Sequence, residues 1–319
     1  MKNEYKILWI DDDHANVRGD VRNIRSFLNY HGIDLIINQV EVTPDNCPTR
    51  EASFSEAVSD IDLDMVFIDF NMPEQGDAII GHIRKNLQHY HLPILFYTGD
   101  KEPEKVLTKI FSDSLLAESN FLSISDGIYF CDRDHIYEKA KLILTSLLEK
   151  DNKPQRGRGL LMDKVSEIDA KIIQALRKLC LDVPETKQKH VLALICKKLE
   201  NRKDKSRKLF ESIQNKSYSD AIESLLSDDL SIDTHFRSET LREMLRYIEG
   251  KTENGTILSN FYNPPKDQPL TKSLIALRND YAHKTGEKIN ETHDKEKCKY
   301  IRTETKRHLF NVKQLLGEI

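Results

Sequence analysis

Acidic side chains follow two short apolar segments in the N-terminal part of the chain. Asp11 and Asp12 come directly after the apolar residues 7–10. Asp69 follows residues 65–68 in the same way, and such runs are typical of buried strands in a parallel sheet. Because the carboxyl ends of parallel strands meet at one edge of the sheet, these acids are expected to face a shared ligand site. Carboxylate oxygens placed there suit Mg²⁺, which takes a few of them and keeps several waters.

A third apolar segment ends in a hydroxyl side chain. Residues 93–97 are followed by Thr98 and Gly99. A single acid after a strand is commonly a solvated loop residue. Two acid clusters and a hydroxyl at three strand ends instead favour a site that holds a cation and a polar ligand.

The run Asp-Phe-Asn-Met-Pro at residues 69–73, together with these strand ends, resembles the receiver domain of two-component response regulators. The resemblance covers about residues 1–150 and implies a doubly wound α/β fold with a five-stranded parallel sheet. It implies that Asp69 accepts a phosphoryl group. It also implies a histidine kinase or a phosphotransfer protein as the partner that donates this group.

Receiver domains hold Mg²⁺ beside the phosphoacceptor, and the resemblance carries the ligands onto residues of this chain. Asp11, Asp12 and Asp69 would supply carboxylates to the metal. Asn71 would supply a backbone carbonyl, and Thr98 would be the switch hydroxyl that closes on the phosphate.

The strand expected at residues 127–131 departs from the family pattern. Receivers have a lysine three residues beyond a switch aromatic side chain. Tyr129 fits the aromatic position, but Asp132 stands at the lysine position. An acid there would remove a charge-assisted contact to the phosphoryl group and add repulsion. Arg133 is the adjacent cation that could replace the lysine.

The pattern of the sequence changes after residue 150. Residues 1–150 alternate strand and helix patterns, whereas residues 160–319 show helical spacing and predict an all-α bundle. Residues 151–159 contain two glycines, one proline and no apolar residue, which predicts an interdomain linker.

Residues 251–269, which contain Gly255 and three prolines, are expected to form a long loop. Helices are expected in the first domain at residues 14–30, 53–60, 76–90, 101–118 and 135–148.

A second group of polar residues lies on a helix expected near the C-terminus. Asn279 and His283 are four residues apart and share a helix face, while Arg278 lies about 140° around the helix from His283. A guanidinium, an amide and an imidazole could bind a phosphodiester and move a proton near neutral pH. The simpler interpretation is a surface arginine and a histidine favoured by the helix dipole.

An Arg-Asn-x-x-x-His run near the end of a helical domain resembles the motif of HEPN domains, many of which are metal-independent ribonucleases. The resemblance implies a homodimer, formed through the helical domain, that brings two copies of the motif together. His283 would act on the 2′-hydroxyl of RNA, Arg278 would stabilise the phosphorane charge and Asn279 would assist by hydrogen bonding. Residues 151–319 hold 33 Lys+Arg against 26 Asp+Glu, a charge of +7 that is compatible with a polyanion partner.

The overall composition excludes several classes of protein. With 39% hydrophobic and 31% charged residues, the chain is typical of soluble globular proteins. No apolar run approaches the roughly 20 residues of a membrane span, and no apolar signal segment follows Met1. The five cysteines form no C-x-x-C pair, which argues against disulfides and structural zinc and favours the cytoplasm.

We therefore interpret the chain as a response regulator whose receiver gates an RNA-cleaving, HEPN-like effector, a combination suited to stress or phage defence. The alternative is a non-enzymatic signalling adaptor, in which the receiver and a dimeric helical domain bind partner proteins. Asp132 at the lysine position favours this alternative, because it would weaken phosphorylation.

Overall fold

The structure is a computed structural model that describes residues 1–42, 62–72, 79, 83, 91–99, 127–200, 207–227, 232–264 and 272–319. The chain divides into two compact units, Lys2–Asp151 and Asn152–Ile319, the second of which also includes Met1. The helices expected at residues 53–60 and 101–118 lie outside the described residues. So does the helix expected at residues 76–90, apart from residues 79 and 83.

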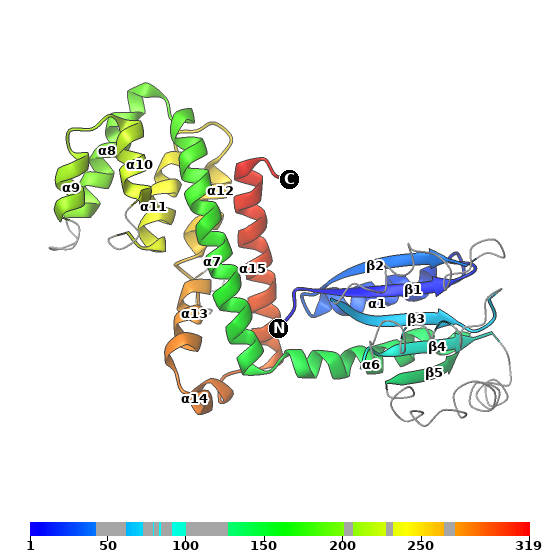
Figure 1. Ribbon diagram of the computed structural model, residues 1–319. Coiled ribbons are helices and arrows are strands. Elements are labelled where there is room, and N and C mark those ends of the chain that lie inside the picture. Colours follow the sequence, from blue (N-terminus) through cyan, green and yellow to red (C-terminus); the bar gives the residue numbers. More distant parts are fainter. Residues whose placement is uncertain are drawn as a thin grey trace. The chain divides into compact units, whose positions relative to one another are not determined.

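The N-terminal unit is built on a five-stranded parallel sheet (Figure 1). Its strand order, β2-β1-β3-β4-β5, is that of the flavodoxin-like doubly wound fold, which confirms the predicted fold class. The strands are β1 (Glu4–Asp11), β2 (Asp34–Glu41), β3 (Leu63–Asp69), β4 (Ile94–Thr98) and β5 (Ile128–Asp132). The helices described here are α1 (Arg18–Tyr30), the 3₁₀ turn η4 (Arg133–His135) and α6 (Ile136–Asp151).

Side chains alternate along the strands and so form an apolar core on each face of the sheet. Trp9 and Phe67 belong to the core on the face that α1 and α6 cover, where Leu144 of α6 is also buried. Ile68 belongs to the core on the other face, together with Ile83. Burial on both faces explains why the central strands read as continuous apolar runs in the sequence.

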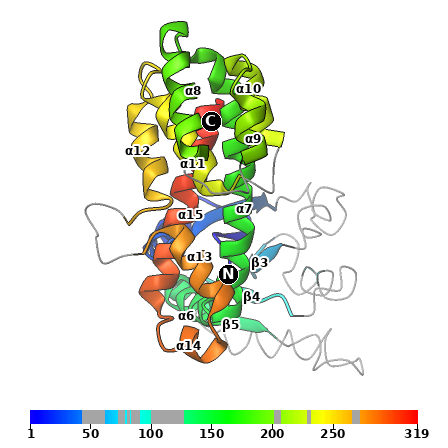
Figure 2. The same ribbon diagram turned by 90° about the vertical axis from the view of Figure 1, so that its left-hand side faces the viewer.

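The C-terminal unit is helical in its described residues, and its helices share one apolar core. Its elements are α7 (Pro154–Leu179), the 3₁₀ turn η5 (Cys180–Asp182), α8 (Glu185–Glu200), α9 (Arg207–Ile213), α10 (Tyr218–Ser227), α11 (Thr234–Leu245), α12 (Thr252–Asn260), α13 (Leu274–His283), α14 (Gly286–Asn290) and α15 (Lys295–Leu316). The long helices α7 and α15 lie side by side and run parallel (Figures 1 and 2). No helix in the described part of the chain has the length and apolar character that crossing a membrane requires.

Two sequence-based expectations for this unit are corrected. Residues 154–159, expected within the linker, form the first turns of α7. Pro154 suits the first turn of a helix, where its missing N–H is not needed, and Gly157 leaves space for the rings of Tyr281 and His293. Residues 252–260, expected within a long loop, form α12, which buries Leu258 in the helical core.

Candidate functional site

The carboxyl ends of β1 and β3 bring three carboxylates together. Asp11 and Asp69 end these strands and are fully buried, while Asp12 is exposed. One carboxylate oxygen from each of the three residues lies within 4.8 Å of the other two. Although Asp12 is exposed overall, partial burial of its carboxylate and the adjacent charge of Asp11 raise its pKa, as expected where like charges lie close together. This set of hard oxygen donors fits Mg²⁺.

Asp69 is held on both of its carboxylate oxygens. Oδ1 accepts a hydrogen bond from the backbone N–H of Asn71 at 3.1 Å, and Oδ2 forms an ion pair with the guanidinium of Arg133. Burial raises the pKa of Asp69, whereas the Asn71 N–H and the charge of Arg133 oppose this rise. Both contacts therefore favour the charged carboxylate, which is the nucleophilic form.

Arg133 reaches Asp69 from the turn that follows β5. Thr98 pairs with Asp132 where β4 and β5 end, so residue 133 is the first beyond the sheet. The Asp132 carboxylate contacts the imidazole of His135. The structure thus places Arg133, the cation expected to be able to replace the family's lysine, beside Asp69, whereas Asp132 contacts His135.

Two further residues of the predicted set meet at the ends of β3 and β4. Thr98 is buried, and its Oγ1 accepts a hydrogen bond from the side-chain amide of Asn71 at 3.1 Å. Tyr129 lies on the edge strand β5, where 37% of the residue is exposed. Its assignment as the switch aromatic stays a prediction.

The sequence interpretation missed a buried hydrogen-bonded chain that ends on Asp11. The indole Nε1 of Trp9 donates to the hydroxyl of Tyr97 at 2.8 Å, and this hydroxyl donates to Oδ2 of Asp11. Buried tyrosine and tryptophan side chains usually need a polar partner. A tyrosine in a buried strand directly before Thr98 was therefore a signal that could have been read from the sequence.

In the helical unit, the Arg-Asn-x-x-x-His residues all lie on α13. Nη1 of Arg278 donates to Oδ1 of Asn279 at 3.2 Å, so the structure brings these two side chains into contact. His283 is the last residue of the helix, about one turn beyond Asn279, and both are exposed. Exposure makes the amide and the imidazole accessible to a large substrate.

A network of partly buried polar contacts joins α13 to α15 and to Asn152, which lies two residues before α7. The hydroxyl of Tyr281 is hydrogen-bonded to Nδ1 of His293, whose Nε2 is hydrogen-bonded to the backbone carbonyl of Asn152. Arg302 of α15 donates to Oδ1 of Asn152 at 2.8 Å. Because Tyr281 lies between Asn279 and His283 in the sequence, this network fixes the helix segment that carries both side chains.

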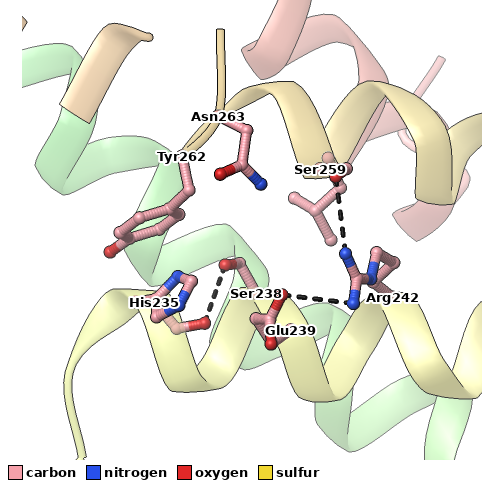
Figure 3. Close-up of a pocket in the computed structure, with 8 residues that line it drawn as sticks. His235, Ser238, Glu239, Arg242, Ser259, Tyr262 and Asn263 are labelled. Carbon is pink, nitrogen blue, oxygen red and sulfur yellow. Dashed lines mark hydrogen bonds and ion pairs between the residues drawn. The ribbon is translucent and has the colours of Figure 1, made fainter. Parts of the chain in front are cut away.

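A small polar pocket lies between α11 and α12 (Figure 3). It has room for roughly one water molecule. Arg242, which lines it, is neutralised by Glu239 at 3.2 Å and by Glu243 at 3.1 Å, and it donates to Ser259 at 3.4 Å. Its size and the pairing of its arginine make this pocket a poor site for a charged ligand.

The sequence matches no protein-family model and no curated protein. Among solved structures, the chain is similar to the chemotaxis response regulator CheY4 of Vibrio cholerae. The two chains are 19% identical, with a TM-score of 0.27, and the similarity covers 46% of this chain and 98% of that chain. The chemistry of this protein is therefore inferred from its own residues.

Proposed function

We propose that the N-terminal unit is a receiver domain that accepts a phosphoryl group on Asp69. The observation that carries this proposal is the convergence of the Asp11, Asp12 and Asp69 carboxylates with the guanidinium of Arg133 at one end of the sheet. A phosphoryl-transfer site needs a nucleophile, a place for a divalent cation and a further positive charge. In this proposal Asp69 is the nucleophile, the three carboxylates hold the cation and Arg133 supplies the further charge.

In this proposal, a carboxylate oxygen of Asp69 attacks the phosphorus of a phosphohistidine, or of a small acyl phosphate. The new P–O bond forms as the bond between phosphorus and the donor breaks, and the donor keeps the electron pair. Mg²⁺, held by Asp11, Asp12, Asp69 and the carbonyl of Asn71, would neutralise the phosphoryl oxygens.

Two other side chains would then contact the product. Arg133 would move its hydrogen bond from the Asp69 carboxylate to the phosphoryl oxygens, since the guanidinium geometry suits both carboxylate and phosphate. The Thr98 hydroxyl would turn toward the same oxygens. This hydroxyl already contacts Asn71, which lies two residues after Asp69 in the sequence.

The test is incubation of the full chain with a small acyl phosphate and Mg²⁺, followed by intact-protein mass spectrometry. Asp69→Asn should abolish the gain of one phosphoryl group, whereas Asp132→Asn, which changes an acid outside the cluster, should retain it. An unmodified wild-type protein, or a modified Asp69→Asn variant, would contradict the proposal.

We further propose that the helical unit is a HEPN-like effector that cuts RNA without a metal and is controlled by the receiver. The contact between Arg278 and Asn279, and the exposure of His283 at the end of the same helix, support this proposal. His283 would take the proton of a 2′-hydroxyl as its oxygen attacks the adjacent phosphorus. The bond to the 5′-oxygen would break as that oxygen takes a proton from water, while Arg278 stabilises the phosphorane.

This second proposal is tested with a mixed RNA pool, with and without the phosphoryl donor. His283→Ala should abolish cleavage, and the donor should change the rate in the wild-type protein. His190→Ala, which removes another exposed helical histidine, should leave cleavage unchanged. RNA that stays intact while Asp69 is phosphorylated would favour a non-enzymatic adaptor, whose helical unit binds a partner protein.

A further inference from the structure

Tyr97 and Trp9 form a chain of hydrogen bonds whose direction is determined by their chemistry. The indole N–H of Trp9 can only donate, so the Tyr97 oxygen is the acceptor in their 2.8 Å contact. The phenolic proton is then directed to Oδ2 of Asp11, because a charged carboxylate can only accept. All three residues are fully buried, so water does not compete for these bonds.

The other oxygen of the Asp11 carboxylate is also held. Oδ1 accepts a hydrogen bond from the backbone N–H of Asp13 at 2.8 Å. With one donor on each oxygen, the carboxylate plane is fixed, while each oxygen keeps lone-pair capacity for a cation. Asp11 is thus oriented by two contacts that a metal ion does not need to displace.

Strand register explains why a tyrosine at position 97 reaches this carboxylate. Asp69 pairs with Tyr97, and Ile10 pairs with Ile68, so residues 11, 69 and 97 lie in one row across β1, β3 and β4. An aliphatic side chain at position 97 would fill the same core but would leave Oδ2 of Asp11 without this donor. The phenol therefore both fills the core and supplies a hydrogen-bond donor to Asp11.

We propose that Tyr97 is a positioning residue that orients Asp11 for a divalent cation, and that Trp9 in turn orients Tyr97. The inference rests on the proposed metal site and extends it to residues that do not touch the metal. Hydrogen-bond partners behind a metal ligand hold it in its binding orientation, and their loss typically weakens metal affinity by about 10- to 100-fold.

The experiment measures Mg²⁺ binding to the full chain by isothermal titration calorimetry. Tyr97→Phe removes only the hydroxyl and should weaken Mg²⁺ affinity by about 10- to 100-fold. Tyr5→Phe is the matched control. Tyr5 also lies on a strand, β1, and its buried hydroxyl donates to the carboxylate of Asp151, the last residue of α6, at 3.0 Å. The control should lose stability by a similar amount but keep the wild-type Mg²⁺ affinity.

Trp9 is the only tryptophan of the chain, which adds a spectroscopic signature. Mg²⁺ should shift its fluorescence in the wild-type protein through the Tyr97 hydroxyl. In Tyr97→Phe at saturating Mg²⁺, the tryptophan should stay buried but show no shift. A purely structural tyrosine would change the melting temperature and leave both the affinity and the fluorescence response intact.

The outcomes separate this inference from the proposed function. Wild-type protein that binds Mg²⁺, with Tyr97→Phe binding equally well, would overturn the positioning role and leave the receiver proposal standing. Wild-type protein that binds no Mg²⁺, with Asp12→Ala behaving identically, would overturn both. Circular dichroism of each variant confirms that the fold is retained, and Trp9→Phe provides a second variant that should weaken affinity through the same chain.

Discussion

The guanidinium of Arg133 forms an ion pair with the Asp69 carboxylate, although 64 residues separate them in the sequence. Asp69 is fully buried, and Arg133 is partly exposed, so the pair links a buried acid to the protein surface. Because a buried carboxylate is costly without a partner, this cation stabilises the charged form of Asp69, which the proposed phosphoryl transfer requires. The behaviour of Arg133 variants is therefore the most direct measure of the site.

Arg133→Ala should slow phosphorylation of Asp69 by about 10- to 100-fold, because a positive charge aimed at the developing phosphoryl charge is lost. Arg133→Lys should recover much of the rate, since it keeps the positive charge but lacks the planar guanidinium group. Initial rates with a small acyl phosphate at saturating Mg²⁺ measure both. Equal rates for wild type and Arg133→Ala would show that the ion pair has no part in the transfer.

Mg²⁺ should stabilise the protein against unfolding, because it binds carboxylates that repel one another in its absence. At a concentration of about 100 times its dissociation constant, the expected gain is about 2.7 kcal/mol. Thermal unfolding with Mg²⁺ or with a chelator measures it. Asp12→Asn should lose most of the gain, whereas Asp34→Asn, an exposed acid at the start of β2, should keep it. A gain that survives in Asp12→Asn would place the cation elsewhere.

Asn152→Ala should destabilise the helical unit by about 1–3 kcal/mol, because it removes an acceptor from the buried guanidinium of Arg302. Urea unfolding followed by circular dichroism measures the loss. The neighbouring Lys153→Ala is the control, since Lys153 is exposed and makes no side-chain cap at the start of α7. Two variants of equal stability would mean that Arg302 is satisfied without Asn152.

The stability of the helical unit should also depend on pH through the protonation of His293. Burial lowers its pKa, and the charge of Lys297 acts in the same direction, while the Asn152 carbonyl and Asp294 oppose it. In the unfolded chain the imidazole takes up a proton near the ordinary histidine pKa of about 6.5. In the folded chain it takes up this proton only at a lower pH, so acid favours unfolding. The stabilising contribution is complete above the ordinary pKa and is lost as the pH falls below it.

Urea unfolding at about pH 7.5 and at about pH 5.5, on either side of that pKa, tests this expectation. The wild-type protein should lose stability on acidification. His293→Gln does not titrate and can still donate an amide N–H, so its loss should be smaller. An identical pH dependence in the two proteins would show that another group is responsible.

The amino-acid sequence by itself determined the α/β fold class and the acids at the strand ends. Continuous apolar runs of strand length predict a parallel sheet buried on both faces, and the polar residue that ends each run must lie at its carboxyl edge. The positions of Asp11, Asp69 and Thr98 at strand ends can be predicted in this way, because each side chain is positioned by its own strand. The helical spacing of the C-terminal half is equally local, and it predicted the helical character of the residues that the structure describes there.

Only the tertiary structure decided which side chains meet across strands. The register between β4 and β5 places Arg133, and not Asp132, beside Asp69. The registers of β1 with β3 and of β3 with β4 together bring Tyr97 to Asp11. In the first turns of α7, Gly157 likewise lies against the rings of Tyr281 and His293, which are more than 100 positions away in the sequence. The periodicity of one strand determines which face of the sheet each of its side chains occupies. A shift of one residue in its pairing with the neighbouring strand would change the cross-strand partner of every side chain. The partners therefore follow from packing between segments, which a single strand or helix pattern does not contain.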